Sequence, residues 1–130
     1  MKAYRDIDIE EEVRAALAEK FTAFASELPA KYKLPNIVVK RIGGTPDMKI
    51  GTYNVTLDAR AKDSATADET MRTALAYLEA IARQQTTKIR HIEINSSGSW
   101  GNDPVRPDLA MFSATLLITA HEENANIEEE

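Results

Sequence analysis

The residues best suited to chemistry in this sequence are its two histidines, His91 and His121. Both lie in segments with a strand pattern, and they would face one another if those strands pair. With a carboxylate from Glu93 or Glu122 they would supply the three protein ligands of a catalytic zinc site. Isolated histidines on strands more often have structural roles, and metal ligands rarely come in so small a set. We therefore expect no metal site and no bound cofactor.

Other catalytic patterns are absent from the sequence. Ser97 and Ser99 lack the G-x-S-x-G elbow of a serine nucleophile, and no phosphate-binding loop, dinucleotide fingerprint or H-E-x-x-H motif is present. The paired carboxylates Glu11 and Glu12 are expected on a solvated helix end rather than in a cleft. The chain has no cysteine, which excludes disulfides and thiolate metal sites and suits a reducing cytoplasm. We therefore expect a protein that is not an enzyme.

Length and composition indicate one folded domain. A chain of 130 residues is large enough for a single hydrophobic core, and 43% hydrophobic with 28% charged residues is ordinary for a globular protein. No run of about 18 apolar residues is present, and the first residues, MKAYRDIDIEEE, are acidic where a signal peptide is apolar. We expect neither a membrane span nor secretion through a signal peptide.

The negative charge is concentrated at one end of the sequence. Five of the 21 acidic residues lie in residues 122–130, which contain no base, and the other 16 equal the 16 Lys and Arg in number. Residues 1–121 are therefore formally neutral and are expected to form the domain, with 122–130 as a flexible acidic tail. A neutral body is a poor candidate for binding nucleic acid, because such binding depends mostly on neutralising phosphates.

Two amphipathic helices are predicted from hydrophobic spacing. The first runs from about Asp8 to Leu28, and Pro29 marks its end. Its apolar positions are spaced by three or four residues: Ile9, Val13, Leu17, Phe21, Phe24 and Leu28. The second is capped by Asp63, Ser64 or Thr66 and ends near Gln85. Its expected buried stripe is Ala67, Met71, Leu75, Leu78, Ile81 and Ala82.

Four strands complete the expected fold. They are Asn36–Ile42, Ile50–Ala61, Lys88–Asn95 and Leu109–His121. The second alternates between apolar and polar residues, as in a strand buried on one face. The fourth is apolar on both sides, which favours a place in the middle of the sheet. The order α-β-β-α-β-β predicts a single-domain α+β fold, with both helices packed on a mostly antiparallel four-stranded sheet.

Two connections are long or unusual enough to suggest contact surfaces. The segment Ser96–Asp108 is predicted as a polar loop and holds the only tryptophan, Trp100. That side chain either anchors an interface or folds back onto its own sheet. The turn Gly43–Lys49, with two glycines and a proline, is expected to project as a hairpin tip, or to be only a turn.

As a whole, the chain resembles the tail terminator proteins of long-tailed bacteriophages, also called minor capsid or tail completion proteins. The resemblance lies in an amphipathic N-terminal helix followed by VVKRIGG, a hairpin, YNVTLDARA, the alanine-rich helix SATADETMRTALAYLEAIA, and a final strand AMFSATLLITAHEE. These segments cover nearly all of the chain. They match in shape and spacing rather than through a catalytic motif.

The resemblance implies a structural assembly protein. Members of this family form a hexameric ring on the head-proximal end of the tail tube, stop tube polymerisation and offer a surface to the head connector, or stopper, protein. The expected location is the head–tail junction of the virion, after assembly in the host cytoplasm, with DNA passing through the lumen without specific binding. We expect the ring and its partners to be contacted through Gly43, Gly44, Pro46, Asp47, Trp100, Asn102 and Arg106.

Two alternative functions remain open from the sequence. Within the structural class, the chain could be another head–tail joining protein of the neck. In a different class, it could be a small-ligand-binding or metal-dependent enzyme domain, with a pocket between sheet and helices near His91 and His121.

Overall fold

The computed structural model describes the backbone of residues 2–5, 7–45 and 50–126, and the side chains of residues 7–44, 50–95 and 101–122. The elements in chain order are β1 (Lys2–Arg5), α1 (Ile9–Ala18), β2 (Ala23–Ala25), β3 (Asn36–Thr45), β4 (Ile50–Ala61), α2 (Ser64–Gln84), β5 (Ile89–Asn102), β6 (Ala110–His121) and β7 (Glu123–Asn126). No helix within these ranges is long and apolar enough to cross a membrane.

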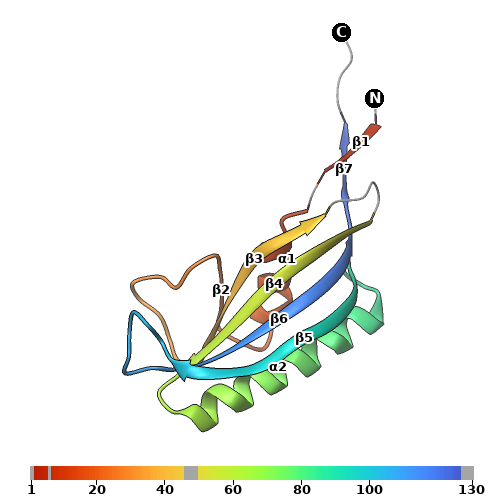
Figure 1. Ribbon diagram of the computed structural model, residues 1–130. Helices are drawn as coiled ribbons and strands as arrows, with labels where there is room; N and C mark the ends of the chain where they lie inside the picture. The colour runs from red at the N-terminus through yellow and green to blue at the C-terminus, as the bar shows by residue number, and fades with distance from the viewer. Residues whose placement is uncertain (1, 6, 46–49, 127–130) are drawn as a thin grey trace.

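The fold is α+β, as predicted, but the sheet differs from the expected one. Five strands pair in the order β2-β3-β4-β6-β5, and β1 and β7 form a separate two-stranded antiparallel ribbon (Figure 1). The short strand β2 runs parallel to β3, whereas the remaining pairs are antiparallel. The expectation of a mostly antiparallel four-stranded sheet was therefore wrong in strand number. The central place expected for Leu109–His121 is confirmed, because β6 lies between β4 and β5.

The first helix is shorter than predicted. It ends at Ala18, where the N–H groups of Lys20 and Phe21 both bond to the carbonyl of Leu17. The chain then turns into β2, whose three residues pair with β3. Phe24 therefore lies on a strand, although its spacing continues the helical pattern. The expected helix Asp8–Leu28 was wrong in its second half, because pairing with a distant strand overrode the local periodicity.

The second helix is as predicted. Asp63 is the N-cap, and its carboxylate accepts the N–H of Thr66 at 2.7 Å. Gln85 ends the helix in the left-handed conformation, a common C-terminal arrangement. The predicted apolar stripe is buried along its length.

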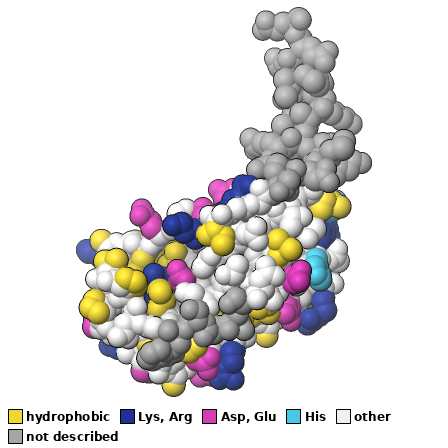
Figure 2. All heavy atoms as spheres, in the orientation of Figure 1, with side chains coloured by type: hydrophobic (Ala, Val, Ile, Leu, Met, Phe, Trp, Pro, Cys, Tyr) yellow, Lys and Arg dark blue, Asp and Glu magenta, His cyan; other side chains and the backbone are white. Residues whose placement is uncertain are grey.

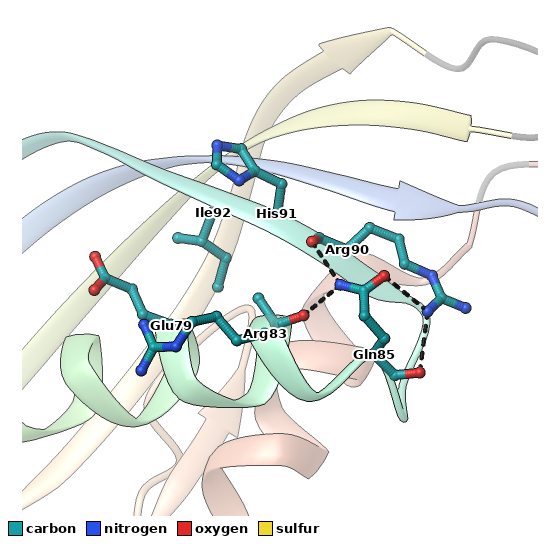
Figure 3. A pocket seen from close by; sticks show the side chains of 7 residues that line it. Glu79, Arg83, Gln85, Arg90, His91 and Ile92 are labelled. Atoms are coloured by element: carbon teal, nitrogen blue, oxygen red, sulfur yellow. Dashed lines mark hydrogen bonds between the residues drawn. The ribbon is translucent and has the colours of Figure 1, made fainter.

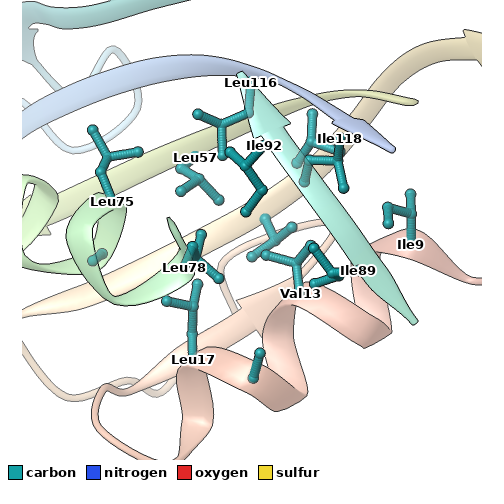
Figure 4. Close-up of a cluster of buried hydrophobic side chains, with 14 of the residues drawn as sticks. Ile9, Val13, Leu17, Leu57, Leu75, Leu78, Ile89, Ile92, Leu116 and Ile118 are labelled. Carbon is teal, nitrogen blue, oxygen red and sulfur yellow. The ribbon is translucent and has the colours of Figure 1, made fainter. Parts of the chain in front are cut away.

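The hydrophobic core lies between the sheet and the two helices, which cover the same face (Figures 1 and 4). Leu57 and Leu116 point from the sheet toward Val13 and Leu17 of α1 and Leu78 of α2. In β4 every second residue from Gly51 to Ala61 is buried, and the residues between them are partly exposed. The other face of the sheet is therefore left uncovered by helices.

Strand β5 extends beyond its predicted end at Asn95. Its backbone continues to Asn102 and pairs with β6 through register shifts near Arg90, Asn95 and Gly98. The expected loop Ser96–Asp108 was therefore wrong over its first half. The shifts allow a segment rich in serine and glycine to follow a long regular neighbour, which local sequence does not reveal.

Part of the expected acidic tail belongs to the folded structure. Glu122 is buried, with 8% of its surface exposed, and Glu123–Asn126 form β7. Residues 127–130 lie outside the described residues.

Candidate functional site

The turn between β5 and β6, residues 103–109, is a surface feature held by several hydrogen bonds. Asp103 organises it: its Oδ1 accepts the N–H of Val105 at 2.9 Å and that of Arg106 at 3.4 Å. Its own N–H bonds to the carbonyl of Leu109 at 3.0 Å, and Leu109 is buried. The turn is thus closed by its own backbone and by one carboxylate.

An ion pair ties this turn to the sheet. Arg60, on the uncovered face of β4, places its Nε 2.7 Å from Asp103 Oδ2, and the two side chains are 13% and 5% exposed. Burial raises the pKa of Asp103, but the Arg60 hydrogen bond and the two backbone N–H groups outweigh it, so the pKa lies below its ordinary value. The carboxylate is therefore held ionised while it fixes the turn.

The turn also contacts the segment that precedes β3. The guanidinium of Arg106 lies over the ring of Tyr32, 4.6 Å from its centroid. Between the two segments is an open groove of about 260 Å³, lined by Ser26, Glu27, Leu28, Val38, Lys40, Asp58, Arg60, Asp103, Val105 and Arg106. It has as many acidic as basic side chains, so it does not favour a strongly charged ligand.

Val105 is presented to solvent at the tip of this turn. Its side chain is 83% exposed, the highest value among the large apolar side chains exposed in the described part of the chain. A turn held by several bonds loses little conformational freedom when it binds. An apolar side chain on such a turn suits contact with another protein rather than catalysis.

The predicted contact residues fall at two opposite ends of the sheet. Gly43 and Gly44 end β3, where Gly44 has a φ of 142° and sits against Tyr53. Trp100 and Asn102 lie on the last part of β5, where their backbones pair with Phe112 and Ala110. The side chain of Trp100 and all of Pro46 and Asp47 lie outside the described residues.

Of the predicted contact residues, Arg106 lies in the turn of residues 103–109. Its guanidinium stacks on Tyr32, so its charge is held against the body rather than extended into solvent. Sequence reasoning missed Asp103 and Val105 beside it. The Asp103-Pro104 pair is a turn-initiating pattern that could have indicated them, whereas nothing local indicates the partnership with Arg60.

The two histidines lie on the uncovered face of the sheet. His91 pairs with Thr119 and His121 with Ile50, and Figure 3 shows His91 pointing away from Ile92, which faces the helix. The space between sheet and helices is filled by apolar side chains instead. Among the described residues no three of the types His, Cys, Asp and Glu are grouped closely enough to hold a metal ion.

A second cleft of about 390 Å³ lies between the outer edge of β5 and the end of α2 (Figure 3). Its lining residues are Glu79, Ala82, Arg83, Gln85, Arg90, His91 and Ile92. Gln85 and Arg90 brace it, because the Gln85 side-chain amide donates to the Arg90 carbonyl at 3.0 Å and the Arg90 guanidinium donates back to Gln85.

A buried polar niche lies at the other end of the sheet, where β6 passes into β7. The Tyr53 hydroxyl, fully buried, donates to the carboxylate of Glu122. Gly51 makes room for that carboxylate, because a Cβ there would overlap Glu122 and lie 2.9 Å from the Tyr53 hydroxyl. The niche fixes the base of β7, and sequence reasoning assigned Glu122 to a solvated tail.

No protein-family model matches this chain, and no curated protein is significantly similar to it in sequence.

Proposed function

We propose that this protein is a tail terminator of a long-tailed bacteriophage. In this role six copies form a ring on the head-proximal end of the tail tube, stop its polymerisation and offer a surface to the head connector or stopper protein. The protein acts through contacts at its exposed ends and does not turn over a substrate. It works at the head–tail junction of the virion, after assembly in the host cytoplasm.

The observation that carries this proposal is the presence of contact features at both ends of one sheet. At one end the Asp103-held turn presents Val105, and at the other the β1–β7 ribbon extends beyond the sheet (Figure 1). Gly51 and Arg60 are nine residues apart on β4, so these ends are separated by about 30 Å. A ring subunit must contact its neighbours in the ring as well as the tube or the connector, so it needs separate contact surfaces.

The side chains on the uncovered face of the sheet favour the proposal that DNA passes through the ring without specific binding. Its centre consists of the cross-strand pairs Thr52 with Thr119, Asn54 with Leu117 and Thr56 with Thr115, all partly exposed and all uncharged. Figure 2 shows that face, where uncharged surface separates scattered charged side chains. Because phosphate contacts would hold the DNA in place, a channel wall with an uncharged centre suits a conduit. We assign this face to the lumen.

The test is to image particles made without the gene. Overlong or irregular tails beside full, tailless heads are expected. Tails of normal length joined to heads would contradict the proposal, and tails of normal length that fail to join heads would favour another neck protein.

A point variant tests the role of the turn. Val105→Asp changes a side chain that is already 83% exposed, so folding should be unaffected. In complementation of the gene-deleted phage, we expect it to lower the yield of joined particles at least about tenfold, as loss of a contact worth about 1.4 kcal/mol would. Asp108→Ala, on the same turn, is the matched control.

A further inference from the structure

The outer edge of β5 and the ribbon formed by β1 and β7 lie outside the candidate site. In the five-stranded sheet, β5 is an edge strand and pairs only with β6. The opposite edge is partly closed: β2 pairs with the first part of β3, and the carboxylate of Glu10 accepts the N–H of Arg41 at 2.9 Å. The long open edge of the described sheet is therefore that of β5.

The cleft beside this edge has the form of a strand-addition groove. An extended segment paired with β5 would lie beside that strand. Its alternate side chains would enter the cleft of about 390 Å³ between β5 and α2. The register of β5 with β6 is regular over His91–Ile94, between two irregular points, so a partner strand of about four residues fits this run.

The charges of the cleft favour an acidic partner. Arg83 and Arg90 contribute two positive charges and Glu79 one negative charge. Arg83 is exposed, and no carboxylate of the described residues forms an ion pair with it. A segment with carboxylates and no base would therefore be attracted to this edge.

The ribbon supplies a strand with these properties. β7 has four residues, pairs with β1 on one side only, and contains one acid, Glu123, and no base; three further glutamates, residues 128–130, follow it in the sequence. Figure 1 shows the ribbon standing clear of the sheet. A two-stranded ribbon that stands alone is marginally stable in water, so it gains most from a further strand.

The base of the ribbon is nevertheless fixed to the body. Ile7, which follows β1, is buried in the core, and Glu122, which precedes β7, is held by Tyr53. Both strands therefore leave the body from anchored positions. Because β7 points away from the body, it cannot reach the β5 edge of its own chain. The β5 edge of a second copy is open to it.

We infer that β7 of one copy, which contains Glu123 and no base, adds to the β5 edge of a second copy beside the cleft of Arg83 and Arg90. The joined sheet then has the order β2-β3-β4-β6-β5, continued by β7 and β1 of the neighbour. The contact is heterologous, since two different surfaces meet, so its repetition can close a ring. The inference deepens the proposed function, on which the choice of a second copy rests.

Cysteine cross-linking tests the contact directly, because the chain has no cysteine of its own. One preparation carries His91→Cys and the other, with a longer tag, carries Asn124→Cys. Mixed under mild oxidant, they should give a heterodimer, since a disulfide needs Cα atoms within about 7 Å. Thr119→Cys replaces His91→Cys as the matched control, because Thr119 neighbours His91 on the same face but on the interior strand β6.

The outcomes separate the possible partners. A higher yield of cross-linked heterodimer with His91→Cys than with Thr119→Cys supports the inference. Equal yields from both, or homodimers of Asn124→Cys as the main product, overturn it, the latter in favour of pairing between two ribbons. Absence of any cross-link at protein concentrations up to about 1 mM also overturns it.

Equilibrium sedimentation supplies a second test. Deleting residues 123–130 should weaken self-association at least about 100-fold, the loss expected for a few main-chain hydrogen bonds. Arg83→Gln should weaken it several-fold at low salt and less at high salt, whereas Arg72→Gln, on an exposed part of the same helix, should not. Unchanged association of the deletion variant would overturn the inference. Tail imaging decides the proposed function separately, since a cross-link can form in a protein that caps nothing.

Discussion

Removing the carboxylate of Asp103 should loosen the turn that presents Val105 and destabilise the protein. Asp103→Ala deletes two hydrogen bonds to backbone N–H groups and leaves Arg60, 13% exposed, without its closest partner. Breaking a buried ion pair by removing one partner costs about 3–5 kcal/mol. Arg60 keeps a weaker partner in Asp58 at 3.9 Å and is not fully buried, so we expect about 2–3 kcal/mol.

Urea unfolding measures this loss at neutral pH. Asp108→Ala is the control, because Asp108 is exposed on the same turn, and it should change the free energy of unfolding by less than about 0.5 kcal/mol. A double-mutant cycle with Arg60→Leu should give a coupling of at least about 1 kcal/mol. If Asp103→Ala is as stable as the control, or if the coupling is zero, the turn is not held as argued.

The pH dependence gives an independent check of the same ion pair. The folded pKa of Asp103 lies below its unfolded value, near 3.9 in model compounds. The stabilisation is therefore fully present above the unfolded pKa and is lost as the pH falls through the folded pKa. The difference in unfolding free energy between the protein and Asp103→Asn should be constant from about pH 5 to 7 and shrink below about pH 4. A difference that grows on acidification would refute the sign of the shift.

Three further predictions concern other parts of the molecule. Gly51→Ala should lower the free energy of unfolding in urea by about 1–3 kcal/mol, because its Cβ overlaps the Glu122 carboxylate. In a Glu122→Ala background the same change should cost less, and an equal cost in both backgrounds would contradict the proposed packing of Glu122 against Gly51. Trp100→Ala should reduce capping of tail tubes in an assembly assay while the circular dichroism spectrum stays unchanged; unchanged capping would count against a contact at this position. Thr56→Arg should slow DNA ejection from otherwise normal particles if the uncovered face lines the channel, and an unchanged rate would remove that assignment.

The elements that sequence predicted well are those whose information is local. The α2 helix has its cap, Asp63, and its apolar stripe within one continuous segment, and β4 shows an uninterrupted alternation. The failures came where distant pairing decides. Phe24 continues the spacing of the first helix, yet its backbone pairs with Val38 of β3. Periodicity cannot reveal that competition.

The candidate site was predictable only in part, for the same reason. The sequence around Asp103 indicates a turn, but the residue that anchors it, Arg60, is 43 positions away. Glu122 reads as the start of an acidic tail because its neighbours are acidic, whereas the niche that buries it consists of Gly51 and Tyr53, far earlier in the chain. In both cases a charged residue is fixed by β4, the strand whose pattern is clearest.

One strand thus sets the geometry of both ends of the molecule. The buried positions of β4 include Gly51 and Tyr53, which hold Glu122 and the base of the ribbon. Its outward positions include Asp58 and Arg60, beside the turn that presents Val105. Since side chains alternate with a period of two, a shift of one residue in the register would turn Arg60 into the core and Tyr53 into solvent. The same alternation that specifies the core therefore specifies the positions of the two contact surfaces, and a variant that keeps the fold must keep both.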